Sequence, residues 1–147
     1  MKTDDQIAVI GAGLAGLTVA RMLADAGHSV TVFDKSRGLG GRMASRRRDG
    51  WRFDHGAITL RPSIDDFAAF LSQTKQQGYA AEWQDADGWT GLPGMSGVVK
   101  GLAEPLTIHT ACEVTALERN AGRWVLHGAT AAVNTGFDHI ILALPQP

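Results

Sequence analysis

The sequence predicts an α/β protein built on a parallel β-sheet, and three observations lead to this class. A short, continuous apolar run at Ile7–Ile10 is typical of a strand that is buried on both faces of a parallel sheet. The next segment, Leu14–Ala26, has an apolar stripe at helical spacing and predicts a helix that stops at Gly27. A second strand, Ser29–Phe33, completes a strand–helix–strand unit, whose crossover is right-handed in nearly all proteins.

The composition restricts the class of protein. The 147 residues, 44% hydrophobic and 20% charged, suit one globular domain or a piece of a larger protein. A net charge of −1 provides no chain-wide basic field, so we expect neither a nucleic-acid nor a membrane partner. The one cysteine excludes an internal disulfide, and no two histidines have helical i,i+3 or i,i+4 spacing, so we predict no metal ligands. The N-terminal apolar run follows Asp4 and Asp5, where a signal peptide would have a positive segment, and glycines interrupt it. We therefore expect a cytoplasmic protein.

The first strand runs into a glycine-rich element, Gly11-Ala12-Gly13-Leu14-Ala15-Gly16. In its G-x-G-x-x-G spacing the first glycine permits a tight turn, the second lets the backbone approach a pyrophosphate, and the third lets helix pack on strand. The helix N-terminus then offers N–H groups and a positive dipole to phosphates. Asp34, at the end of the second strand, is placed to accept hydrogen bonds from a ribose. These residues predict dinucleotide binding; a turn that serves packing alone is the other interpretation.

The segment after Asp34 distinguishes between dinucleotides. A nicotinamide dehydrogenase normally continues into another helix and strand, whereas this chain reads Lys35-Ser36-Arg37-Gly38-Leu39-Gly40-Gly41-Arg42-Met43. Gly40-Gly41-Arg42 resembles the second part of a signature in FAD enzymes similar to glutathione reductase and the amine oxidases. The resemblance implies that FAD is the cofactor, that the glycine pair passes close to it, and that Arg42 lies near its phosphates and ribityl chain. A guanidinium suits that position because it is a forked, permanently charged donor.

Two further segments strengthen the resemblance: Asp54-His55-Gly56-Ala57 and Pro93-Gly94-Met95-Ser96. Together with Asp34–Met43 they resemble bacterial renalase-type flavoproteins of the flavin-containing amine oxidase superfamily. The resemblance implies a Rossmann-like FAD/NAD(P)-binding domain with a parallel sheet and a β-meander. It places Gly56 and Ala57 beside the isoalloxazine ring, Val114 at the adenine, and Ala143-Leu144-Pro145 at the closing motif, where relatives carry threonine in place of leucine. The implied cofactor-binding residues are Gly11, Ala12, Gly13, Leu14, Ala15, Gly16, Asp34, Lys35, Gly41, Arg42, Gly56, Ala57, Val114 and Ala143.

The remaining elements follow from periodicity and turn residues. Ser63 and Asp66 form a variant capping box for a helix that ends near Gln77. We expect nucleotide-binding pieces at 1–57 and 94–147 and an insertion toward a substrate domain at 58–93. The other expected elements are an extended piece at 51–57, a glycine-rich loop at 88–97, a helix at 98–103, strands at 106–110, 113–118, 124–127 and 138–143, and a hairpin turn at 120–122.

Several residues keep two interpretations. The basic run Arg46–Arg48 is either a solvated loop face or an attractor for a phosphorylated substrate. His55 either packs or acts near the flavin edge, and Cys112 is interpreted as a small buried residue of a strand. The four tryptophans (Trp51, Trp83, Trp89 and Trp124) are interpreted as core or domain-contact residues.

The resemblance implies an FAD-dependent oxidoreductase that oxidises a reduced, isomeric NAD(P)H and passes the electrons to dioxygen. It predicts no catalytic side chain, because the flavin carries out the chemistry. The chain covers about the first half of the family's length, without the C-terminal Gly-Asp motif that holds the ribityl chain. Two alternatives stay open: an inactive FAD- or NAD-binding fragment, and a flavin amine oxidase acting on an amine. We expect self-association, because the last strand would leave an apolar edge uncovered.

Overall fold

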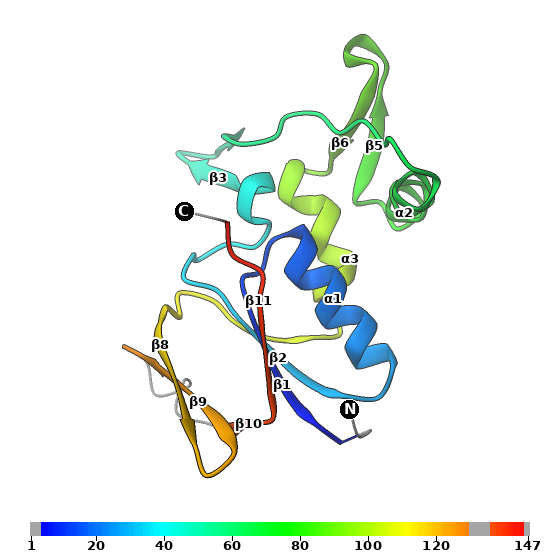
Figure 1. Cartoon of the computed structure of the whole chain (residues 1–147). Coiled ribbons are helices and arrows are strands. Elements are labelled where there is room, and N and C mark those ends of the chain that lie inside the picture. The colour runs from blue at the N-terminus through cyan, green and yellow to red at the C-terminus, as the bar shows by residue number, and fades with distance from the viewer. Residues whose placement is uncertain (1–3, 130–135, 146–147) are drawn as a thin grey trace. The chain divides into compact units, whose positions relative to one another are not determined.

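The computed structural model describes residues 4–129 and 136–145. The chain forms two compact units, each described by itself below. The first contains residues 1–41 and 105–147, and the second contains residues 42–104. Figure 1 shows the chain and labels many of its helices and strands.

The first unit is built on a four-stranded parallel sheet with the order β11-β1-β2-β7. Its strands are β1 (Gln6–Ile10), β2 (Ser29–Phe33), β7 (Thr107–His109) and β11 (His139–Leu142), and α1 (Leu14–Asp25) connects β1 to β2 (Figure 1). Each predicted element lies within two residues of the observed one. The α/β fold with a parallel sheet is therefore confirmed.

Both faces of β1 are buried. Successive residues of a strand point to opposite sides of the sheet, and all residues from Ile7 to Ile10 are buried. On one face, Ala8 and Ile10 join a cluster with Phe33, Leu126 and Phe137. The Phe33 ring meets the Phe137 ring edge to face at 5.8 Å, an arrangement that aromatic pairs favour. This confirms the prediction, made from the continuous apolar run, that the strand is buried on both faces.

A second, antiparallel sheet supplies part of that cluster, in the order β10-β9-β8. Its strands are β8 (Val114–Asn120), β9 (Arg123–Gly128) and β10 (Gly136–Phe137). The two-residue turn between β8 and β9 has φ of 48° at Ala121 and 84° at Gly122. Positive φ at both positions is the type I′ geometry that matches the twist of paired strands. The predicted meander and its hairpin turn are confirmed.

The second unit combines two hairpins with helices. One hairpin is β3 (Ser45–Arg48) with β4 (Trp51–Asp54), and the other is β5 (Ala80–Trp83) with β6 (Gly88–Gly91). The helices are α2 (Asp65–Gln76) and α3 (Lys100–Ala103), with short 3₁₀ turns η2 (Gln84–Ala86) and η3 (Met95–Val99). A further 3₁₀ turn, η1 (Gly41–Met43), lies at the start of this unit.

Three predicted details of the second unit are wrong. The capping box is absent, since α2 begins after Ile64 without a side-chain cap, and two aspartates in its first turn complement the helix dipole instead. The segment 88–97, expected to be a loop, contains strand β6 and turn η3. Gly88 is needed there for packing, because a Cβ at this position would lie 2.4 Å from the Thr59 hydroxyl oxygen. The basic run Arg46–Arg48 is exposed as expected, but it forms strand β3 rather than a loop.

The interpretations of several single residues also need correction. Trp51 and Trp83 are 71% and 41% exposed, so they are not core residues, and His55 is exposed rather than packed. Cys112 is buried as predicted, but it lies in the connection after β7 and not in a strand. β11 lies at an edge of the parallel sheet. Among residues 4–129 and 136–145, no helix is long and apolar enough to cross a membrane.

The β8–β9 turn yields a stability prediction. Ala121→Asn should raise the free energy of unfolding by about 0.5–1 kcal/mol, because asparagine tolerates positive φ better than alanine and Asn-Gly favours this turn. Urea unfolding measures the change. Ala116→Asn, in an exposed part of β8, is the control and should not stabilise. An unchanged or lower stability of Ala121→Asn would contradict the turn geometry.

Candidate dinucleotide-binding site

The glycine loop between β1 and α1 is held by backbone groups in close approach. Gly11 has a φ of +112° and its N–H donates to the Phe33 carbonyl at 2.8 Å. A Cβ on Gly16 would lie 1.9 Å from the Gly11 carbonyl oxygen, and a Cβ on Gly11 would lie 2.4 Å from the Ala143 carbonyl oxygen. Glycine is therefore required at both positions by the packing of the protein itself.

The middle glycine of the loop differs from its neighbours. A Cβ on Gly13 would meet only the Cα of Gly41, at 4.0 Å. Gly13 is the N-cap of α1, no side chain caps that end, and the first turn contains no acidic residue. The first N–H groups of a helix have no intrahelical partner and carry its positive dipole end. The open space and these donors fit an anionic group such as the pyrophosphate of a dinucleotide.

Asp34 connects the glycine loop to the segment that follows β2 through hydrogen bonds of its carboxylate. Its Oδ2 accepts the Ala12 N–H at 2.6 Å, and its Oδ1 accepts the Ser36 N–H at 2.7 Å. Its backbone is also fixed, since its N–H donates to the His109 carbonyl at 2.9 Å. Each carboxylate oxygen keeps a further lone pair for a ligand hydroxyl. Spacing alone indicated the ribose role of Asp34 but did not show that it ties the backbone together.

After β2 the chain returns to the glycine loop. The Gly40 N–H donates to the Ala12 carbonyl at 2.9 Å, and Gly13 and Gly40 form an isolated parallel bridge. Gly40 and Gly41 have φ of 109° and 55°, a region that favours glycine. A Cβ on Gly41 would lie 3.3 Å from the Gly13 Cα. The glycine pair therefore allows two backbone segments to lie side by side at the N-terminal end of α1.

Three other predicted residues of the first unit have different surroundings. The Ala143 N–H donates to the Ile10 carbonyl at 2.9 Å, and its backbone borders the glycine loop. Ala143 thus packs against the glycine loop, a role that its motif did not indicate. Val114 packs against the apolar cluster around Phe33, and Lys35 is exposed.

The three predicted residues of the second unit contact one another. The Ala57 N–H donates to the Arg42 carbonyl at 2.9 Å. A Cβ on Gly56 would lie 2.0 Å from the same oxygen, so only glycine permits this bend. The structure therefore joins the Gly-Gly-Arg and Asp-x-Gly-Ala segments, which lie far apart in the sequence, through one carbonyl group.

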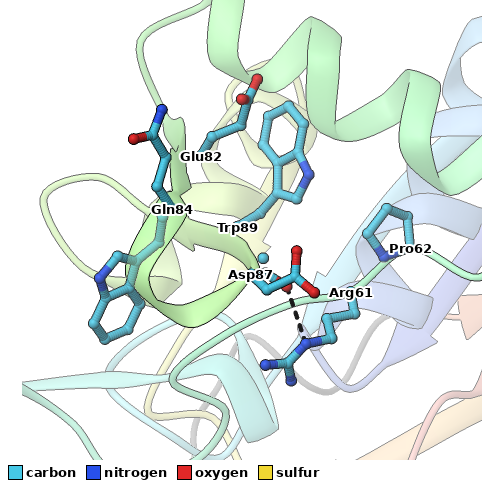
Figure 2. Close-up of a pocket in the computed structure, with 8 residues that line it drawn as sticks. Arg61, Pro62, Glu82, Gln84, Asp87 and Trp89 are labelled. Atoms are coloured by element: carbon cyan, nitrogen blue, oxygen red, sulfur yellow. Dashed lines mark hydrogen bonds between the residues drawn. The ribbon is translucent and has the colours of Figure 1, made fainter.

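The second unit also contains an open hollow of about 530 Å³, shown in Figure 2. It is lined by Arg61, Pro62, Glu82, Trp83, Gln84, Asp87, Gly88 and Trp89, none of which is a predicted site residue. Arg61 donates through Nη2 to the Ala86 carbonyl at 2.6 Å and through Nε to the Asp87 carbonyl at 3.0 Å. Glu82 pairs with Lys75 at 2.8 Å. The bonds of Arg61 connect its segment to the turn of the β5–β6 hairpin, and the lining of the hollow includes no residue of the glycine loop.

Tyr79 is a titratable residue of the second unit whose pKa is shifted. The Tyr79 hydroxyl donates to the Glu104 carboxylate, and this bond, with smaller contributions from desolvation and the carboxylate's charge, raises the pKa of the phenol. Tyr79 therefore stays protonated through the neutral range. Within the described residues, no group of three or more His, Cys, Asp or Glu side chains could hold a metal ion.

Comparison with known proteins agrees with this geometry. Residues 9–74 match the family of NAD(P)-binding Rossmann-like domains, and the observed strands, helix and glycine loop form that architecture. The chain thus contains a Rossmann-like fold with a parallel sheet. A 4,4'-diapophytoene desaturase of Staphylococcus aureus (strain MRSA252) is 48% identical over 60 residues, which are 40% of this chain and 12% of the desaturase.

Two solved structures share the fold over almost the whole chain. A fatty acid isomerase from P. acnes superimposes with a TM-score of 0.76 at 17% identity, covering 99% of this chain and 60% of that protein. A protoporphyrinogen oxidase homologue from Exiguobacterium sp. 255-15 gives a TM-score of 0.74 at 10% identity, with the same coverage. The chain with its Rossmann-like domain therefore spans about three-fifths of the length of these proteins.

The contrast between two glycines of the loop can be tested directly. Gly13→Ala should leave the free energy of unfolding within about 1 kcal/mol of the wild type, because its Cβ has room, but should weaken dinucleotide binding at least about tenfold. Gly16→Ala should lower the free energy of unfolding by about 1–3 kcal/mol, because its Cβ overlaps the Gly11 carbonyl. Urea unfolding and a dinucleotide titration measure both effects. Equal stability of the two variants would contradict the observed packing.

Asp34 yields a second prediction. In Asp34→Asn only one side-chain oxygen is left, so either the Ala12 or the Ser36 N–H faces the amide NH₂. We expect a loss of about 1–3 kcal/mol in stability and about 10- to 100-fold in dinucleotide affinity. Thermal unfolding and calorimetric titration measure these changes. Asp25→Asn, in an exposed ion pair of α1, is the matched control and should change both by little; a similar loss there would refute the role of Asp34.

Proposed function

We propose that this chain binds FAD and forms the cofactor-binding part of a renalase-like oxidoreductase. The substrate class is a reduced, isomeric nicotinamide dinucleotide, and dioxygen is the electron acceptor. The observation that carries the proposal is the return of Gly40 and Gly41 to the glycine loop, where the Gly40 N–H bonds the Ala12 carbonyl.

This return favours FAD over NAD as the resident dinucleotide. A nicotinamide dehydrogenase of the same architecture normally continues from its acidic residue into another helix and strand. Here the chain turns back from Asp34 to Gly13 and then forms the short turn Gly41–Met43. The Gly40-Gly41-Arg42 sequence that makes this turn resembles the second FAD signature.

The proposed roles of the residues follow from their chemistry. The N–H groups at the start of α1 bind the pyrophosphate, and the free lone pairs of Asp34 accept ribose hydroxyls. Arg42 provides a permanent positive charge, and Gly56 and Ala57 provide a backbone edge for the ring system. When bound, FAD supplies the two-electron chemistry, hydride acceptance followed by reduction of dioxygen to hydrogen peroxide. The protein supplies position and electrostatics.

A second candidate is nucleotide binding without turnover. The exposure of Arg42 and Gly56 favours it, because orientation of the substrate against the flavin provides much of the rate in such reactions. The desaturase and the isomerase act on other substrates according to their names, and their similarity supports the nucleotide-binding part only. The assignment of residues 58–93 to a substrate side belongs to the same proposal.

Anaerobic mixing of the FAD-loaded chain with reduced nicotinamide isomers tests the proposal. We expect the flavin absorbance to bleach at least about tenfold faster than that of free FAD, since a tenfold effect needs only about 1.4 kcal/mol of orientation, and to recover when oxygen is admitted. A primary amine, mixed in parallel, should bleach neither the loaded chain nor free FAD. Bleaching by the amine alone would indicate an amine oxidase, and rates equal to free FAD with both reductants would indicate binding without turnover.

A further inference from the structure

The second unit contains a polar cluster that none of the predicted roles explains. Asp54 Oδ1 accepts the Ser45 hydroxyl and also the Met95 N–H, the latter at 3.0 Å. Ser45 Oγ in turn accepts the Ser96 N–H at 3.1 Å. Two side chains thus satisfy two backbone donors at the beginning of η3, and the cluster links β3, β4 and η3.

The β3–β4 hairpin is arranged around this cluster. Ser45 pairs with Asp54 across the hairpin, and both side chains are half-buried. The residues of the opposite face are exposed, with Phe53 at 55% and Trp51 at 71%. The face with Ser45 and Asp54 is therefore the more buried one, and the hydrogen bonds of these two side chains offset the cost of burying them.

The backbone at Gly94 lies close to the cluster. A Cβ on Gly94 would lie 2.8 Å from Ser45 Oγ and 3.2 Å from Asp54 Oδ1. Glycine at this position lets the backbone before η3 approach both side chains. The Pro-Gly-Met-Ser segment thus has a structural partner in Asp54, some 40 residues earlier in the chain.

Asp54 also begins the bend that carries two proposed flavin-side residues. Directly after it, the chain turns so that Gly56 passes the Arg42 carbonyl and the Ala57 N–H bonds it at 2.9 Å. One end of this bend is fixed by the Ser45–Asp54 cluster, and the other end by Arg42. A displacement of Asp54 would therefore displace Gly56, Ala57 and Arg42 together.

We infer that Asp54 is a positioning residue, which acts through Gly56, Ala57 and Arg42 on the flavin half of the cofactor. The inference rests on the proposed binding of FAD. It separates two roles, because the glycine loop and Asp34 hold the adenosine diphosphate half, whereas the Asp54–Ser45 cluster sets the residues for the flavin half. The affinity for ADP should then be independent of Asp54, and the additional affinity for FAD should depend on it.

The test compares the dissociation constants of ADP and FAD, measured by calorimetric titration of the full chain. In Asp54→Ala the advantage of FAD over ADP should fall at least about tenfold, while the ADP affinity is unchanged. Asp54→Asn keeps one oxygen for both donors and should retain most of that advantage. Ser45→Ala, which removes both hydrogen bonds of the Ser45 hydroxyl but keeps the carboxylate and its bond from the Met95 N–H, should fall between them. The visible circular dichroism of bound FAD should change in the same order.

A matched control separates positioning from general loss of stability. Leu71→Ala removes a fully buried side chain of α2 in the same unit, and should lower the melting temperature without changing the FAD-to-ADP ratio. An equal fall of the ratio in Leu71→Ala, or an unchanged ratio in Asp54→Ala, would overturn the positioning role alone. If the wild-type chain bound FAD no more tightly than ADP, that result would overturn the proposed FAD function and this inference with it.

Discussion

The first unit depends on how closely its backbone segments approach one another at the carboxyl end of β1. The Gly11 carbonyl lies where a side chain on Gly16 would be, and the Ala143 backbone lies where a side chain on Gly11 would be. Since these contacts leave no room for a methyl group, α1 can start directly against the sheet. The N-terminus of α1 then faces open space at Gly13. The packing and the proposed binding of a pyrophosphate thus follow from the same backbone geometry.

Both units use a carboxylate in the same way. Asp34 follows β2 and accepts the Ala12 N–H just before α1, while Asp54 ends β4 and accepts the Met95 N–H at the start of η3. At Met95 the carboxylate satisfies one of the first N–H groups of a helical turn, which have no partner within the turn, whereas at Ala12 it satisfies an N–H that precedes the helix. Each carboxylate also binds a second protein group, Ser36 or Ser45. Each aspartate therefore organises the backbone segments of its own unit.

Local sequence signals were sufficient for the strands and the helix of the first unit and insufficient for the details of the second. The run Ile7–Ile10 and the turn at Ala121–Gly122 each have one favourable conformation, and both were predicted. The capping role of Ser63 was wrong because α2 begins two residues later, with aspartates already in its first turn. The exposure of Trp51 could not be read from its type, since it follows from the burial of Asp54 and Ser45 on the opposite face of the hairpin. The roles of Ala143 and Asp54 depend on partners far away in the chain, which periodicity and spacing do not identify.

The central claim is that the returning Gly40–Gly41 segment makes this Rossmann-like domain a site for FAD rather than NAD. The direct measurement is a calorimetric titration of the chain with FAD and, separately, with NAD⁺, two dinucleotides that share the adenosine diphosphate half. The account predicts that FAD binds at least about tenfold more tightly, a difference of about 1.4 kcal/mol or more. Tighter binding of NAD⁺ would contradict it.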